Sequence, residues 1–310
     1  MRVFVAGASG AIGRRLLPQL IEAGHEVTGM TRSEQSAEGI RAAGAEATVC
    51  DVFDAEALAA AVAAARPEAV VNQLTSLPER YDPRKIDYEP TNRVRVEGGR
   101  NLIGAAAAAG ARRLVIQSIA FLYAPEGDWV KDEEARPFSD APAPFDSGVE
   151  AMLTAERDAL EAPGMEGLVL RYGQFYGPGT YYAPGGSQAQ DVRRRRFPVV
   201  GKGTGTFSFI HLDDAASATV AAVERGPAGV YNVVDDEPTQ LREWLPVYAD
   251  ALGAKPPRRV PLWLARLVAG RFTASLATEL RGASNAKAKR ELGWSPRYRS
   301  WRQGFREALG

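Results

Sequence analysis

Residues 3–13 read VFVAGASGAIG, and this stretch decides the fold. The apolar run at residues 2–6 predicts a buried strand. After three spaced glycines, residues 11–23 carry apolar side chains at helical spacing, which predicts a helix. A strand, a glycine-rich loop and a helix in immediate succession are typical of the first unit of a dinucleotide-binding sheet.

Each glycine of this loop has its own physical reason. Gly7 allows the tight turn out of the strand, Gly10 lets the backbone approach a pyrophosphate, and Gly13 lets the helix pack closely on the strand. The helix N-terminus then faces the phosphates with free N–H groups and a positive dipole end. A glycine-rich turn that binds nothing is the alternative, and the flanking strand and helix argue against it.

The alternation of strand and helix patterns continues to about residue 176. It predicts an α/β Rossmann fold, a doubly wound parallel sheet with helices on both faces. We expect an NAD(P)-binding domain over residues 1–176 and a smaller, mostly helical, substrate-covering portion over residues 177–310. The strand pattern near 229–234 is expected to return to the first sheet.

Composition narrows the class of protein. Lys and Arg total 38 and balance the 38 Asp and Glu, so there is no general attraction to nucleic acid or to an anionic membrane. One cysteine and two histidines argue against a disulfide framework and against a metal site. No signal peptide and no apolar run near ~20 residues is visible. We expect a cytoplasmic protein that binds a small-molecule substrate, and a homodimer is compatible with the sequence.

The end of the second predicted strand indicates NADP rather than NAD. An NAD site places an acid there to hold the ribose 2′-OH. Here the strand ends GMTR at 29–32, and the guanidinium of Arg32 suits a 2′-phosphate. The alternative is that Arg32 is a solvated loop residue, and Glu34 is close enough to keep NAD open.

Further cofactor contacts are expected in the glycine loop and at the C-terminal ends of strands, where doubly wound sheets bind ligands. Asp51 and Val52, just past the third strand, are placed to flank the adenine. The other residues expected by position are Ser9, Ala11, Ile12, Gln73, Leu74, Gln117 and Tyr172.

The chain resembles the extended short-chain dehydrogenase/reductase family, which contains nucleotide-sugar epimerases and dehydratases. The resemblance covers nearly the whole chain and implies an NAD(P)-dependent enzyme with a Rossmann fold. The segments that carry it are GASGAIG at 7–13, VRVEGGRNLIGAAAAAG at 94–110, LRYGQFYGPG at 170–179, FSFIHLDDAA at 207–216 and NAKAKRELGWSPRYRSWRQGF at 285–305.

In that family an Asn, a Ser, a Tyr and a Lys normally carry the chemistry, and the Tyr is the acid/base. The Tyr-x-x-x-Lys helix normally has a Glu four residues after the Lys. Taking Glu156 as that acid puts Met152 at the Lys position and Gly148 at the Tyr position. Met cannot lower a neighbour's pKa electrostatically and Gly has no proton to give.

The Ser and Asn positions also depart from the family pattern. Counting back from Tyr123 puts Ile119 at the Ser position, with Ser118 one residue early. A strand residue shifted by one points to the opposite face of the sheet. The Asn position falls on Arg95, with Asn92 one turn away, and Arg95 could supply the missing positive charge if it reaches the cleft. The resemblance is therefore to an atypical branch.

Other side chains near the predicted cleft are candidates for the role of the missing Tyr. Tyr123, Tyr176 and Tyr182 lie on predicted loops after strand ends, and Asp146 lies near the missing Tyr. Ser118 is the best polar group for a substrate carbonyl if the strand register permits. The alternatives are packing roles for the tyrosines and a helix-start role for Asp146.

The segment that binds the substrate in nucleotide-sugar enzymes of the family also departs from the family pattern. Nucleotide-sugar enzymes of the family commonly carry an Arg four residues before the His of the segment at 207–216, and here that position is Phe207. The arginines at 193–196 either compensate or form a solvated face, so we lean against a nucleotide sugar. We expect an NADP-dependent oxidoreductase acting on a small carbonyl or hydroxyl compound. The alternatives are an epimerase or dehydratase with a tightly held cofactor, and a non-catalytic NADP-binding sensor or scaffold.

Overall fold

A computed structural model describes residues 1–78, 80 and 86–309. Within this part of the chain, seven parallel strands form one sheet in the order β12-β7-β5-β4-β1-β2-β3. This order confirms the predicted doubly wound Rossmann fold. The strands are β1 (Arg2–Ala6), β2 (Glu26–Thr31), β3 (Glu46–Val49), β4 (Ala69–Asn72), β5 (Arg113–Ile119), β7 (Glu166–Tyr172) and β12 (Gly229–Val233).

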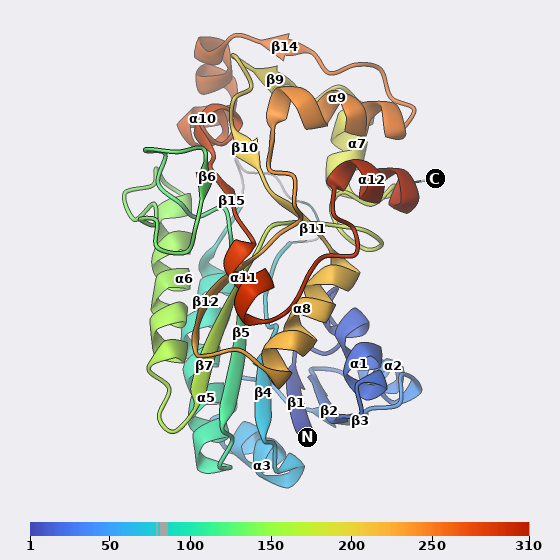
Figure 1. Cartoon of the computed structure of the whole chain (residues 1–310), viewed down its shortest axis with the longest axis vertical. Helices are drawn as coiled ribbons and strands as arrows, with labels where there is room; N and C mark the ends of the chain where they lie inside the picture. Colours follow the sequence, from blue (N-terminus) through green and yellow to red (C-terminus); the bar gives the residue numbers. More distant parts are fainter. Residues whose placement is uncertain (79, 81–85, 310) are drawn as a thin grey trace.

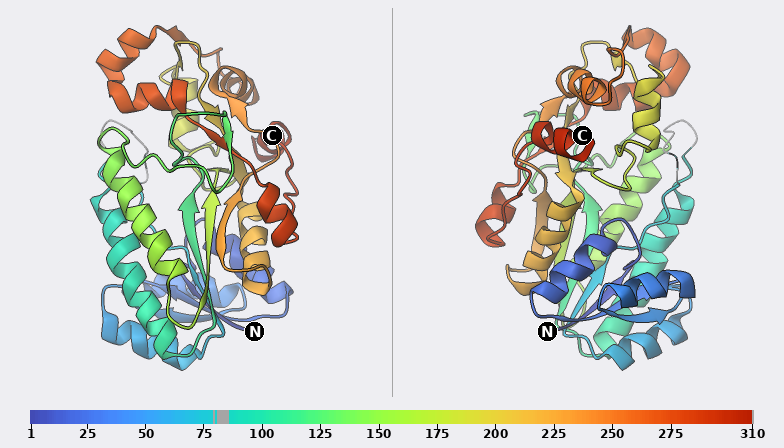
Figure 2. Two further views of the ribbon diagram at one scale, coloured as in Figure 1. Left: turned by 60° about the vertical axis from the view of Figure 1, so that its left-hand side comes forward. Right: turned by 90° about the vertical axis from the view of Figure 1, so that its right-hand side faces the viewer.

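Helices cover both faces of the sheet (Figures 1 and 2). One face carries α1 (Gly13–Glu22), α2 (Glu34–Ala42) and α8 (Leu212–Glu224). The other carries α3 (Ala55–Ala65), α4 (Glu89–Arg93), the π-helix η1 (Val94–Gly98), α5 (Gly99–Ala108) and α6 (Phe145–Leu160). The segment from α4 to α5 is one continuous helical rod that packs against α6. Its N-terminal end follows the C-terminal end of β4, so it begins at the ligand-binding edge of the sheet.

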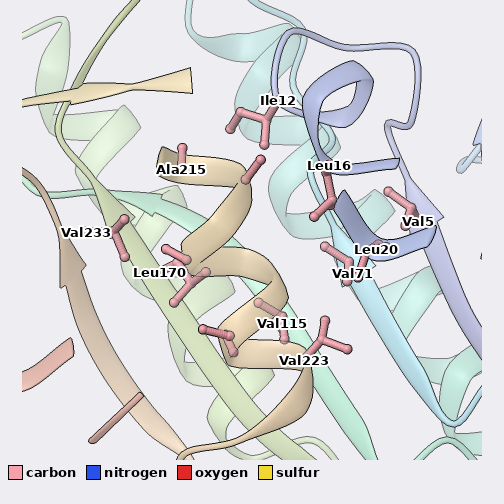
Figure 3. Close-up of a cluster of buried hydrophobic side chains, with 14 of the residues drawn as sticks. Val5, Ile12, Leu16, Leu20, Val71, Val115, Leu170, Ala215, Val223 and Val233 are labelled. Carbon is pink, nitrogen blue, oxygen red and sulfur yellow. The ribbon is translucent and has the colours of Figure 1, made fainter. Parts of the chain in front are cut away.

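The main core lies between the sheet and the helices α1 and α8 (Figure 3). Val5 and Val71 of β1 and β4 face Leu16 and Leu20 of α1, and all four are buried. The buried Val115 of β5 lies beside Val223 of α8. Alternate strand residues pack against the opposite helix layer, so the strands are apolar on both faces, as a parallel sheet requires. Burial of each such side chain contributes about 1.5–3 kcal/mol.

The C-terminal portion lies beyond the C-terminal edge of the sheet (Figure 1). It contains α7 (Ser187–Arg193), α9 (Leu241–Ala251), α10 (Leu262–Glu279) and α12 (Trp301–Leu309), whereas α11 (Ala286–Glu291) packs beside β12. In the described part of the chain, two short strand pairs lie within this portion, namely β10 (Thr206–Phe207) with β13 (Thr239–Gln240) and β9 (Val199–Val200) with β14 (Arg259–Val260). Two more join it to earlier segments, namely β8 (Gln174–Tyr176) with β11 (Phe209–His211) and β6 (Val130–Lys131) with β15 (Gly282–Ala283). The sheet edge and this portion together enclose the candidate site. The domain boundary at 176/177 stays a prediction.

Candidate active site

The glycine loop after β1 is built so tightly that side chains have no room. Gly7 has φ +85°, and a Cβ there would lie 2.8 Å from the backbone of Gln73. A Cβ at Gly13 would lie 2.4 Å from the carbonyl oxygens of Gly7 and Ala8. The Gly10 N–H donates to the Gly7 carbonyl at 3.0 Å, which closes the turn. The loop therefore presents backbone rather than side chains to the sheet edge.

The N-terminus of α1 fits an anionic phosphate. Ile12 precedes the helix and no side chain caps it, while the N–H groups of Arg14 and Arg15 donate to the carbonyls of Gly10 and Ile12. The positive end of the helix dipole therefore faces this side without a side-chain cap. The first turn carries no acid, and Arg14 and Arg15 follow Gly13 directly. Exposed Ala11 and buried Ile12 frame this end of the helix. The loop and helix together meet the requirements of a dinucleotide pyrophosphate.

The end of β2 carries an exposed cation. Among the described residues, Arg32 makes no hydrogen bond or ion pair, whereas Glu34 is bonded to Arg41 at 2.6 Å. The Thr31 hydroxyl is engaged with Ser9 at 3.1 Å, which ties the glycine loop to this strand. The preference for NADP over NAD stays a proposal, and the free guanidinium fits it.

The other expected cofactor residues lie along the same edge of the sheet. Asp51 is exposed and accepts a hydrogen bond from Phe53, and the buried Val52 packs against η1. The Leu74 carbonyl accepts a hydrogen bond from Gln117 at 2.9 Å. This bond joins the ends of β4 and β5.

The position of Tyr172 does not support the expected cofactor contact. Its side chain is fully covered, and its hydroxyl is held by Thr219 at 2.6 Å and Gln73 at 3.2 Å. Burial raises the pKa of Tyr172 to about 12. The sequence pattern did not reveal that Tyr172 faces α8 inside the core rather than the cleft.

Two of the expected catalytic residues belong to a buried polar network. Ser118 donates to Glu156 at 2.6 Å, and Glu156 forms a two-pronged ion pair with Arg171 at 2.6 and 2.9 Å. Tyr123 accepts from Arg171 at 3.1 Å and donates to Asn232 at 2.7 Å. Burial raises the pKa of Tyr123 to about 12. The network satisfies both hydroxyls within the protein.

Tyr176 and Tyr182 pack in the aromatic core of the C-terminal portion. Tyr176 lies on β8 rather than on a loop, edge-on to Phe209, and Tyr182 packs against Trp244 and Phe209. Burial raises the pKa of both tyrosines. Asp146 is exposed in the first turn of α6, where its carboxylate caps the adjacent backbone N–H. The structure thus does not bring the five expected catalytic residues together, and their roles stay predictions.

The positions counted for the family's Ser, Tyr and Lys meet in one apolar cluster. Ile119, Phe121, Phe145, Met152 and Tyr88 pack together there, and we call these five the apolar wall. Gly148 lies under the Tyr88 ring, because a Cβ on it would touch the ring at 3.4–3.6 Å. The wall therefore presents hydrocarbon and aromatic surface at the positions of the family's Ser, Tyr and Lys, and the Tyr88 phenol is the one hydroxyl among these five side chains.

An aromatic hollow adjoins this wall, between the start of α6 and α10. Phe121 and Phe145 line it together with Phe138, Phe272 and Leu276. The rings of Phe145 and Phe272 are stacked with centroids 5.0 Å apart. Sequence reasoning missed these residues, because isolated aromatic residues in separate segments carry no spacing signal.

Comparison with known proteins settles the family. A family model described as the NAD dependent epimerase/dehydratase family matches residues 3–233. The chain belongs to this family. The resemblance noted in the sequence is confirmed, and the protein is an enzyme of an NAD(P)-dependent oxidoreductase and epimerase family.

Two curated proteins that are similar to this chain are named as reductases. The chain is 46% identical over 307 residues to a 3-diazoavenalumate denitrifying reductase from a Streptomyces species, covering 98% of this chain and 99% of the relative. It is 30% identical over 320 residues to a 4-hydroxy-2-methyl-3-oxo-4-farnesyl-3,4-dihydroquinoline-1-oxide ketoreductase from Stigmatella aurantiaca, covering 96% and 92%.

Solved structures of two epimerases share the fold. A UDP-glucose 4-epimerase from Thermotoga maritima, solved with UDP-glucose, has a TM-score of 0.78 at 22% identity and covers 100% of this chain and 97% of its own. A UDP-glucose 4-epimerase from Thermus thermophilus, solved with NAD, has a TM-score of 0.75 at 24% identity and covers 100% and 98%. In the described part of this chain no helix is long and apolar enough to cross a membrane, and no group of three or more His, Cys, Asp or Glu could hold a metal ion.

Proposed function

We propose that this protein is an NAD(P)H-dependent reductase that replaces the diazo group of an aromatic compound by hydrogen and releases N₂. The observation that carries the proposal is the apolar wall, where Ile119, Gly148 and Met152 stand at the counted Ser, Tyr and Lys positions. Reduction of a carbonyl needs a positioned proton donor for the oxygen. Reduction of a diazonium group needs none, and the relative at 46% identity is named a denitrifying reductase.

The proposed reaction balances without an acid or a base. The reduced nicotinamide, when bound, supplies a hydride. An aryl diazonium cation that gains this hydride becomes an arene and N₂, as the carbon–nitrogen bond breaks and a carbon–hydrogen bond forms. The positive charge passes to the oxidised cofactor, and no proton enters or leaves overall.

Three parts of the protein have separate tasks in this reaction. The glycine loop and the N-terminus of α1 hold the cofactor phosphates. The partly exposed rings of Phe121 and Phe138 offer aromatic surface for the substrate ring, beside the buried and mutually stacked Phe145 and Phe272. The apolar wall excludes water and leaves a nearby cation poorly solvated, so neutralisation of that cation by hydride is favoured.

The test is turnover with a stable aryl diazonium salt such as 4-methoxybenzenediazonium. We expect stoichiometric formation of the arene, N₂ and oxidised cofactor, with rates well above those of a Gly10→Val control that measures the uncatalysed background. Cofactor oxidation is expected to show a rate effect with cofactor deuterated at nicotinamide C4, and essentially the same rate in D₂O as in H₂O. Production of arene at the background rate would refute the proposal.

Carbonyl reduction is the second candidate, because a relative at 30% identity is a ketoreductase. It predicts the same effect of deuteration at nicotinamide C4 but, unlike diazonium reduction, a slower rate in D₂O, since a proton must reach the alkoxide oxygen. A panel of aryl ketones run beside the diazonium salt distinguishes the two. Turnover of ketones with no turnover of the diazonium salt would establish this candidate instead.

We further propose that the cofactor is NADP(H). The free guanidinium of Arg32 at the end of β2 supports this choice, and Glu34 is already paired with Arg41. Arg32→Ala is expected to weaken NADP⁺ binding about tenfold, which equals ~1.4 kcal/mol and lies within reach of one charge-assisted contact. NAD⁺ affinity should not change. Calorimetric titration of both cofactors checks this, and equal, unaltered affinities in the variant would overturn the assignment.

A further inference from the structure

The segment from α4 to α5 carries three arginines, and one of them differs from the other two. Arg93 is bonded to Glu97 at 2.7 Å, and Arg100 is bonded to Asp158 at 2.7 Å. Among the described residues, Arg95 makes no hydrogen bond and no ion pair. It is only partly exposed, in a small recess between η1, α5, α6, the end of β4 and the middle of β5, where the carboxylate of Asp158 is paired with Arg100.

The surroundings of Arg95 disfavour the charged form of its side chain. Burial lowers the pKa of Arg95 to about 10, against a smaller opposing effect of the Tyr88 phenol. A guanidinium removed from water without a partner carries a desolvation penalty. Proteins satisfy most such groups, so an exception calls for an explanation, and a ligand is one.

The neighbouring amide is unsatisfied as well. Asn92 lies three residues before Arg95, on the same face of the helical rod, and its buried Oδ1 has no hydrogen-bond partner in the described structure. An amide turned by half a rotation presents its NH₂ group instead. Two adjacent polar side chains therefore have hydrogen-bonding capacity that the protein does not use.

The geometry of the helical rod also indicates which way the side chains of Arg95 and Asn92 lean. Side chains on a helix lean toward its N-terminus, and this rod begins at the ligand-binding edge of the sheet. From η1, that direction leads from Arg95 toward Tyr88 of the apolar wall, whose phenol is close enough to influence the Arg95 pKa. A π-helix at this point is itself unusual, and such segments occur frequently at functional sites.

We infer that Arg95, assisted by Asn92, binds a negatively charged oxygen of the aromatic substrate, a carboxylate or an ionised phenol, beside the apolar wall. The inference rests on the proposed function in placing the substrate ring against that wall. An anion held by Arg95 fixes one end of the ring. Repulsion from the guanidinium directs a cationic group to the opposite end. Arg95 is thus a substrate-orienting residue.

The experiment measures binding of unreactive probes to the full-length protein saturated with NADP⁺. Cinnamate carries a carboxylate only, 4-nitrophenol above its pKa carries a phenolate only, and cinnamamide is the neutral match of cinnamate. Arg95→Met is expected to weaken binding of at least one anionic probe tenfold or more, and Arg95→Lys should retain part of it. The difference between the two anions identifies which oxygen the site takes.

Three controls separate this role from a structural one. Cinnamamide binding and NADP⁺ affinity should change less than twofold in Arg95→Met. Arg100→Met/Asp158→Asn, which removes a paired arginine together with its carboxylate partner from the same recess, should leave binding of both anions unchanged. The melting temperature of Arg95→Met should not fall, because the substitution removes an unpaired charge.

Several results would overturn the inference. Wild-type protein that binds neither anion more tightly than cinnamamide, or an equal loss for charged and neutral probes, excludes an anion site. Loss of NADP⁺ affinity in Arg95→Met assigns the residue to the cofactor instead. The probes undergo no reduction, so absence of diazo turnover with intact, Arg95-dependent anion binding would refute the proposed function alone.

Discussion

Gly10→Val is expected to abolish NADP(H) binding, with a loss of more than ~100-fold in affinity, or ~2.7 kcal/mol. The loop itself should accept the change, because a Cβ at Gly10 meets a single atom within 4 Å, the Gly7 carbonyl oxygen at 3.1 Å. The valine branches would stand where the pyrophosphate must approach the backbone. Calorimetric titration with NADP⁺ measures the affinity, and a thermal melt shows whether the fold is retained.

Two glycine variants serve as controls for this prediction. Gly39→Val lies in α2, where an added Cβ has open space, and should leave cofactor affinity unchanged. Gly13→Ala should damage the loop itself, because its Cβ would lie 2.4 Å from two carbonyl oxygens, and should lower stability as well as affinity. Wild-type affinity in Gly10→Val would show that this loop is not the phosphate site.

The parallel sheet could be predicted from the sequence because its signals are local. The strand, the glycine loop and α1 follow one another within residues 2–22, so periodicity alone identifies them. The short strand pairs of the C-terminal portion carry no such signal. β6 and β15 are two residues each and lie some 150 positions apart, and a pattern with period two needs a longer run to be recognised.

The candidate site was predictable only in part. The residues at the family's Asn, Tyr and Lys positions, which here are Arg95, Gly148 and Met152, could be located by counting along the sequence. The spacing between such positions within a helix is regular, so no three-dimensional structure was needed. Which way a side chain faces at a strand end is not local. Tyr176 was expected on a loop at the cleft, but β8 pairs with β11 and buries it against Phe209. Its surroundings come from segments that are remote in sequence.

Arg171→Met is expected to lower the free energy of unfolding by about 3–5 kcal/mol. Arg171 and Glu156 are each only 5% exposed at the side chain and share two hydrogen bonds. Burial alone would lower the pKa of Arg171, but the Glu156 carboxylate more than offsets this and raises it. Removal of the guanidinium leaves a buried carboxylate whose remaining hydrogen-bond partner is Ser118. Urea denaturation monitored by circular dichroism measures the loss.

The double variant Arg171→Met/Glu156→Leu tests whether the penalty comes from the uncompensated charge. It should be more stable than Arg171→Met, because apolar replacement of both partners removes the buried carboxylate along with its cation. A double variant that is less stable by the sum of the two single losses would mean that packing, not charge, sets the cost.

The same network decides between a structural and a catalytic role for the two hydroxyls that it holds. Ser118→Ala and Tyr123→Phe each remove a buried hydrogen bond and should cost about 1–3 kcal/mol of stability. On a substrate that the protein turns over, both should keep the rate within a few-fold, because their hydroxyls are already satisfied by Glu156, Arg171 and Asn232. A rate loss of ~100-fold or more, typical of a removed acid/base, would restore that residue as a catalytic group. The proton-independent reaction proposed for this site would then be wrong.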